Sequence, residues 1–299
     1  MEYIRTFTQE FDVGDELELS VDSRSGTVTV RGEDTSRARV EVVARLWAES
    51  AGEADEQADL IDRGIMHQGG RLSIRAPTLL RAGPFFFFAR GPRIDYQVTV
   101  PRTTEATISN RSGRVEAEQI KGPLVIDARS GRVSVREIGG DTKIVSRSGA
   151  VQAESIAGAL TVESRSGTVR ISRCRLDASV QIRSGTLQIE DVGGDLKIDS
   201  RSGVVGVSDV KGGVFMRTAS GSVRYEGAVG GPFDIEVISG SVRLLIDPDS
   251  RFFLDAESTS GAVHSDLSLR RRSPSGAGSE TGPTLRVRTR SGSIHIAPR

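Results

Sequence analysis

The fold is decided by a repeating segment, of which residues 124–149, LVIDARSGRVSVREIGGDTKIVSRSG, are one example. This stretch contains Arg-Ser-Gly twice, beginning at Arg129 and Arg147, and the two copies are 18 residues apart. Eleven units of the chain carry such a Ser-Gly pair, and between Ser112 and Ser220 the interval of 18 residues never varies. A fixed period this short indicates units that stack on one another, because no single unit can bury its apolar face alone.

Apolar and polar residues alternate on both sides of each Ser-Gly pair. Leu124 and Ile126 precede the first pair of this stretch, and Val133 and Val135 follow it. A period of two predicts two short strands per unit, each with one buried face. Between the strands an apolar residue leads into a glycine turn, as in Ile138-Gly139-Gly140. We expect glycine in both turns of a unit because it adopts positive φ without steric cost.

A unit of 18 residues is too short for a strand–helix–strand crossover and suits one coil of a parallel β-solenoid. The competing all-β fold is an antiparallel sandwich, which would not require the same residue at the same phase of every unit. We therefore predict an all-β chain in which residues 106–299 form a parallel β-solenoid, or β-helix, of two-strand coils. One unit has Cys174–Asp177 in place of the usual glycine turn, and we expect an irregular turn there.

Residues 1–105 leave the repeat and predict a β-rich N-terminal cap that contains the first coil, at Arg24-Ser25-Gly26. A short amphipathic helix is expected at about Glu53–Ile65, because its apolar residues share one face and its first turn is acidic. Its expected role is to cover the end of the solenoid, since open strand edges invite aggregation. Further strands are indicated at residues 39–44, 71–74 and 94–100.

A loop of the cap carries four consecutive aromatic residues, Phe85, Phe86, Phe87 and Phe88, between two Gly-Pro pairs. Three interpretations remain open: a plug in the core at the solenoid end, a docking surface for a partner or a second copy, or shallow insertion into a membrane. A second segment, residues 270–283, is rich in Gly, Ser and Pro and predicts a flexible insertion in the last coil.

Composition limits the classes of partner. Forty basic and forty acidic residues cancel, so overall charge gives no reason to expect binding to nucleic acid or to an anionic membrane. The single cysteine, Cys174, excludes an intramolecular disulfide and is expected to be a small buried apolar residue. The sequence shows neither a signal peptide nor a membrane-spanning run, which predicts a cytoplasmic protein.

The arginine before each Ser-Gly pair is the main candidate for binding. In stacked coils these side chains would form an external column, with acids two residues earlier at Asp127, Glu163 and Asp199. One interpretation is a lattice of surface ion pairs, each contributing little alone. The alternative is a groove for a polyanion such as an acidic polysaccharide. The candidate arginines are Arg129, Arg147, Arg165, Arg183 and Arg201.

Catalysis is not expected. The three acids would lie two coils apart, about 9–10 Å, which approaches the carboxylate separation of inverting glycosidases. An adjacent arginine lowers the pKa of a carboxyl group, however, which is the wrong direction for a general acid. His67, His264 and His295 are scattered along the sequence, so we expect no metal cluster, no histidine-based triad and no cofactor.

The units at Val21–Val30 and Leu160–Val169 resemble the bacterial putative-adhesin β-strand-repeat family, a domain-of-unknown-function group with Ser-Gly turns at this kind of spacing. The resemblance covers nearly the whole chain. It implies a β-solenoid and a role at the cell surface. Its motifs describe turns and strands, so no active-site residues follow from it.

These observations favour a non-catalytic scaffold or protein-interaction module. Self-association is one form of this function, end to end or as a dimer, because the last recognisable strand, Ser293–Ile296, is expected to leave a parallel edge uncovered. The alternative is an adhesin-like surface module that binds a polyanionic glycan along its arginine face.

Overall fold

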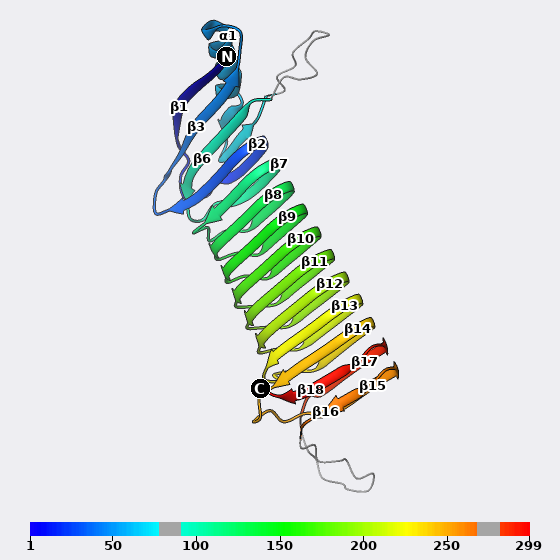
Figure 1. Cartoon of the computed structure of the whole chain (residues 1–299). Coiled ribbons are helices and arrows are strands. Elements are labelled where there is room, and N and C mark those ends of the chain that lie inside the picture. The colour runs from blue at the N-terminus through cyan, green and yellow to red at the C-terminus, as the bar shows by residue number, and fades with distance from the viewer. Residues whose placement is uncertain (78–90, 268–281) are drawn as a thin grey trace. The chain divides into compact units, whose positions relative to one another are not determined.

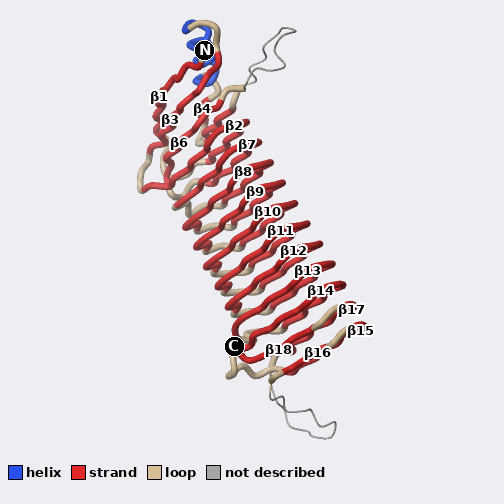
Figure 2. The backbone as a smooth tube through the Cα atoms, viewed as in Figure 1, coloured by secondary structure: helices blue, strands red, loops and turns tan. Residues whose placement is uncertain are grey.

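The computed structural model describes residues 1–77, 91–267 and 282–299, and strands dominate them (Figure 2). The chain divides into two compact units, Met1–Ala157 and Gly158–Arg299. In each unit, long strands stack in parallel, and the 18-residue period sets their register. The predicted parallel β-solenoid is therefore confirmed. No described helix is long and apolar enough to span a membrane.

The first unit contains four stacked coils. Strand β2 pairs with β7, β7 with β8, and β8 with β9, all in parallel. Each pairing aligns equivalent positions of successive repeats, so that Gly113 lies beside Gly131 and Val133 beside Val151. The bounds are β2 Glu18–Glu33, β7 Glu105–Glu118, β8 Leu124–Ile138 and β9 Thr142–Ile156.

Beyond these four coils, β2 also pairs with two later strands of the cap. Strand β5 pairs with the first half of β2 and β6 with the second half, both in parallel. Antiparallel strands extend each half, since β4 pairs with β5, β3 with β6 and β1 with β3. The bounds are β1 Glu2–Asp12, β3 Arg37–Trp47, β4 Ile65–Gln68, β5 Arg71–Arg75 and β6 Arg93–Pro101.

The expected helix is present as α1, Ala51–Asp62. It begins two residues earlier than predicted because the Ser50 hydroxyl accepts a hydrogen bond from the Glu53 backbone N–H and so caps the first turn. The Arg5 side chain on β1 forms an ion pair with Asp55 of the helix at 2.6 Å. Ala54 and Ile61 are fully buried, and the helix packs against β1 and β3 within the cap.

In the second unit, β10 to β14 stack in parallel in chain order. Its internal columns match the prediction: Val169 lies beside Leu187, Leu187 beside Val205, and all three are buried. The bounds are β10 Leu160–Cys174, β11 Ala178–Val192, β12 Leu196–Val210, β13 Val214–Gly227, β14 Phe233–Ile246, β15 Phe253–Ser260, β16 Val263–Ser265, β17 Thr284–Ser291 and β18 Ile294–Pro298.

The end of the second unit departs from sequence order. The last two strands, β17 and β18, pair with β14 on one side and with β15 and β16 on the other (Figure 1). The prediction that Ser293–Ile296 forms an uncovered edge is therefore wrong. The outermost coil consists of β15 and β16, which we call the terminal coil.

At the Ser-Gly corner, the two strands expected in each unit join into one continuous strand that bends. Gly149 has φ of 123° and Gly185 has φ of 134°, as predicted for this turn. A Cβ atom on Gly185 would lie 1.9 Å from the carbonyl oxygen of Gly167 in the preceding coil, so glycine is also required by the close approach of the coils.

The serine of each corner has its own structural role. The bend removes the arginine of Arg-Ser-Gly from the ladder, since Ser164 pairs with Ile182 and Ser166 with Ser184 while Arg165 is skipped. The Ser184 hydroxyl donates a hydrogen bond to the Arg165 carbonyl oxygen at 3.5 Å, and Ser202 repeats the contact with Arg183 at 3.4 Å. The serine column therefore satisfies acceptors that the bend removes from the ladder.

The second turn differs from the prediction. Its left-handed residues are not glycines but the residues before the apolar one: Gln119, Glu137, Ser155, Arg173, Asp191 and Asp209, with φ between 54° and 60°. The glycines that follow are needed for close packing instead, because a Cβ on Gly193 would lie 2.3 Å from the Arg175 carbonyl oxygen. The turn at Cys174–Asp177, expected to be irregular, follows the same path, with Cys174 beside Val192 and Ala178 beside Leu196.

Candidate functional site

The predicted arginine column is exposed in both units. Arg129 and Arg147 belong to the first unit, and Arg165, Arg183 and Arg201 belong to the second. Each lies at a corner where the ladder skips one residue, which leaves its side chain outside the stacked strands. Phe85, Phe86, Phe87 and Phe88 lie outside the described residues.

The expected ion-pair lattice is not formed by the arginines of the second unit. Within residues 158–267 and 282–299, the guanidinium groups of Arg165, Arg183 and Arg201 form no ion pair. Acids pair instead with arginines inside the strands, as in Arg217–Glu236 at 3.4 Å and Arg224–Glu226 at 3.2 Å. We call Arg165, Arg183 and Arg201 the arginine ridge.

The terminal coil exposes the end of the apolar core. Leu254 lies beside Leu285, and Val263 lies beside Ile294. Leu285 and Ile294 are fully buried, but Val263 is 43% exposed. Among the described residues, no strand pairs with the outer edge of β15 or β16. The terminal coil therefore presents a strand edge that no described strand covers, beside partly exposed apolar side chains.

Two of the three histidines meet at the terminal coil. His264 on β16 lies directly beside His295 on β18 in the parallel register. The carboxylate of Asp266 lies between them, with Oδ1 2.8 Å from His264 Nε2 and Oδ2 3.1 Å from His295 Nε2. One ligand atom from each of the three lies within 4.8 Å of the others, close enough to share one ion. We call these residues the histidine–aspartate cluster.

The expectation that the histidines are scattered is wrong for His264 and His295, although His67 lies apart in the cap. A signal was present in the sequence: each of the two is the third residue after the glycine of a Ser-Gly pair, Gly261 and Gly292. Residues at the same phase of stacked coils become neighbours. The spacing did not reveal that these two coils are adjacent, because the segment between them is longer than one period.

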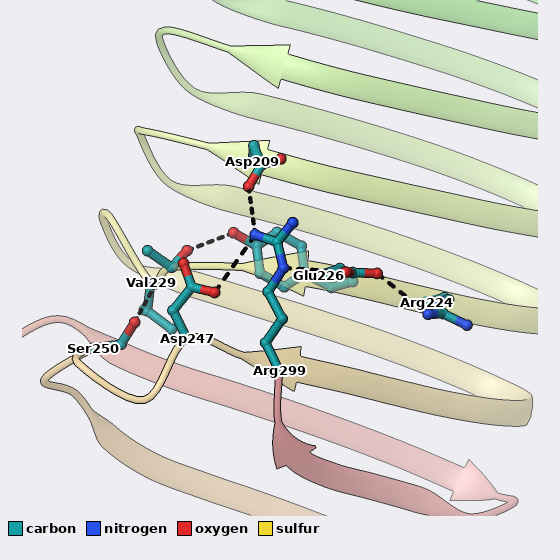
Figure 3. A network of polar contacts seen from close by, with 9 residues as sticks. Asp209, Arg224, Glu226, Val229, Asp247, Ser250 and Arg299 are labelled. Carbon is teal, nitrogen blue, oxygen red and sulfur yellow. Dashed lines mark hydrogen bonds and ion pairs between the residues drawn. The ribbon is translucent and has the colours of Figure 1, made fainter.

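A network of charges surrounds Arg299 on the second unit (Figure 3). Its Nη1 atom lies 3.1 Å from Asp209 Oδ1 and 3.5 Å from Asp247 Oδ1, and its Nε atom lies 3.1 Å from Glu226 Oε1. The charge of Asp209, followed by those of Asp247 and Glu226, raises the pKa of the Arg299 guanidinium. The residue after β18 is thus bound to acids at the ends of β12 and β13 and after β14, which gives the network a structural role. Sequence analysis did not identify it.

Solved structures resemble the chain along nearly all of its length. The crystal structure of a "putative cell adhesion protein" from Clostridium sporogenes has 9% identity and a TM-score of 0.25, over 99% of this chain and 100% of that chain. A "putative adhesin" from Parabacteroides distasonis has 12% identity and a TM-score of 0.36, over 98% and 97%. A "putative adhesin" from Bacteroides fragilis has 11% identity and a TM-score of 0.31, over 99% and 97%.

No curated protein matches the chain. The family model described as Toastrack DUF4097 matches residues 17–193 and 177–297, which together cover most of the sequence. The chain therefore belongs to the Toastrack DUF4097 family.

Proposed function

We propose that this protein is a non-catalytic interaction module that associates with a second copy of itself through the terminal coil. The observation that carries the proposal is the outer edge of β15 and β16, which no described strand covers. An edge of this kind is a template for another strand, since its N–H and C=O groups lie in a regular row.

The expected occupant is a strand with the side-chain pattern of the repeat. Leu254 and Val263 continue the internal columns of Leu285 and Ile294, so a strand with apolar residues at the same phase would cover them. Strands with that pattern are supplied by other copies of this chain. Contact between two identical terminal coils closes a dimer, whereas contact with a different surface produces an open fibre.

The test measures molar mass by light scattering during size-exclusion chromatography over a hundredfold range of protein concentration. We expect a concentration-dependent mass for the wild type and a monomer for Val263→Lys, because lysine on an edge strand opposes strand addition. Val204→Lys is the matched control, since Val204 is 52% exposed but lies on β12, away from the terminal coil. A wild-type monomer at every concentration contradicts the proposal, as does equal association of both variants.

The arginine ridge supports a second candidate function, binding of a polyanion such as an acidic polysaccharide. Its three guanidinium groups recur on consecutive coils and are not neutralised by acids of the second unit. Neighbouring coils lie about 4.8 Å apart, so a linear polyanion running along the ridge would meet a cation at each step. Charge-assisted hydrogen bonds from arginine to carboxylate or sulfate groups would supply the attraction.

Retention on a heparin column tests this candidate. Changing Arg165, Arg183 and Arg201 to Gln should lower the salt concentration needed for elution. A matched variant changes Arg217, Arg224 and Arg286 to Gln, which removes the same charge but from arginines that already pair with acids. If both triple variants elute at the same salt concentration, binding depends only on net charge and the ridge has no special role.

A further inference from the structure

We infer that His264, Asp266 and His295 form a binding site for one divalent transition-metal ion, with Zn²⁺ as the best-matched candidate. Two imidazole nitrogens and one carboxylate oxygen are a donor set typical of zinc. Magnesium and calcium prefer sites made only of oxygen ligands and do not match it. The remaining coordination positions would be filled by water, as in zinc sites with three protein ligands.

The backbone holds the three ligands in place before any ion binds. His264 and His295 are directly paired between β16 and β18. The Asp266 backbone N–H donates a hydrogen bond to the Ile296 carbonyl oxygen at 2.8 Å, which fixes the residue that follows β16. Because the backbone positions are already set, ion binding would require only rotation of exposed side chains.

The side chains already converge on one point. Both histidines direct Nε2 at the same carboxylate, and their ring centroids are 5.4 Å apart. Bonds from zinc to nitrogen and oxygen are about 2.0–2.2 Å, so tetrahedral ligand atoms lie about 3.3 Å from one another. The ligand atoms of the cluster lie within 4.8 Å of each other, and small rotamer changes would bring them to that spacing.

Two features of the surroundings limit the affinity. The side chains of His264 and Asp266 are 71% and 47% exposed, so water competes for the ion. Arg243 on β14 lies beside His295 in the parallel register, on the side away from His264, and its positive charge opposes a cation. We therefore expect weaker binding than in a closed site with four protein ligands, and tighter binding in Arg243→Gln.

A bound ion would join the terminal coil to the coil beneath it. Two ligands belong to β16 and the residue after it, and the third belongs to β18. Strand β16 has only three residues, so its backbone pairing is short and one added cross-link has a large effect. Binding to the folded arrangement alone stabilises it in proportion to the logarithm of the free metal concentration.

Isothermal titration of the full-length protein with ZnCl₂ tests the inference, with MgCl₂ as the metal control. We expect one Zn²⁺ ion to bind per chain, and a loss of affinity of at least about tenfold in His264→Ala, His295→Ala and Asp266→Asn. His67→Gln is the matched control, because His67 belongs to the cap and should leave the affinity unchanged. Circular dichroism of each variant shows that a loss of binding is not a loss of folding.

Hydrogen exchange provides a second readout. Zn²⁺ should slow amide exchange in residues 263–266 and 294–297 of the wild type, and should have no such effect in the His264→Ala and His295→Ala double variant. The inference is overturned if the double variant binds Zn²⁺ with wild-type stoichiometry and affinity. It is also overturned if Mg²⁺ binds as tightly as Zn²⁺, because an exposed carboxylate would then explain the result.

Discussion

Replacement of Gly185 by alanine should destabilise the second unit far more than its added methyl group suggests. The residue has φ of 134°, a conformation that costs a residue with a side chain about 1–3 kcal/mol. The new Cβ would lie 1.9 Å from the carbonyl oxygen of Gly167, whereas real Cβ atoms stay beyond 3.0 Å. To relieve the clash the two coils must separate locally by about 1 Å, which weakens the adjacent ladder hydrogen bonds by about 0.5–1.5 kcal/mol each.

Together these costs predict a loss of at least about 3 kcal/mol in the free energy of unfolding. The measurement is urea denaturation followed by circular dichroism, with Gly206→Ala as the matched control. Gly206 lies in β12 at ordinary φ, and its added Cβ would have its nearest neighbour at 3.9 Å. That control should be neutral, or stabilising by up to about 1 kcal/mol, because alanine restricts the unfolded chain. Equal effects of the two substitutions would refute the assignment of the corner.

Three further predictions concern single side chains. Val169→Asp places an unpaired charge in the fully buried internal column and should cost about 3–5 kcal/mol in unfolding experiments, whereas a wild-type midpoint would contradict the column. Burial raises the pKa of Asp95, but hydrogen bonding from the Thr27 backbone N–H, together with Arg93 and Arg45, outweighs this and lowers it below its ordinary value. Because the pKa of Asp95 is lower in the folded than in the unfolded protein, its ionised carboxylate stabilises the fold at pH above the unfolded-state pKa. This stabilisation is lost as the pH falls through the folded-state pKa. Asp95→Asn should therefore be less stable than wild type at neutral pH and equal to it in acid, and a constant difference across pH would exclude the linkage. Burial raises the pKa of the Cys174 thiol, so a thiol reagent at neutral pH should react only after urea unfolds the protein, and fast labelling of the native chain would contradict this.

The sequence predicted the parts of the fold that depend on the position of a residue within its 18-residue repeat. Residues such as Val169 and Leu187 occupy the same place in successive units, and stacking follows directly from that identity. The second turn was predicted less well, because the sequence shows that Gly193 is required but not whether φ or close packing requires it. The left-handed residue there is Asp191, and aspartate tolerates this conformation better than most residues do.

The candidate sites depend on which coils are neighbours in space, and the position of a residue within its repeat does not determine this. The arginine ridge was predicted as a row of exposed side chains, but the sequence did not show that its three guanidinium groups form no ion pair within residues 158–267 and 282–299. The histidine–aspartate cluster was not predicted, because His264 and His295 become neighbours only through the insertion of β17 and β18 beneath the terminal coil. Strand β1 was also missed, since it pairs antiparallel and carries no Ser-Gly pair.

The order of strands at the end of the second unit has a consequence for folding during synthesis. The ribosome releases β15 and β16 before β17 and β18, yet in the native structure the later pair lies against β14. Leu254 and Phe233 both pair with Leu285, so β15 has the phase needed to dock directly on β14 while the rest of the chain is still being made. The nascent protein therefore contains its own competitor for one docking site. To reach the native order, β15 and β16 must either dissociate from β14 or remain undocked until β17 and β18 have been synthesised.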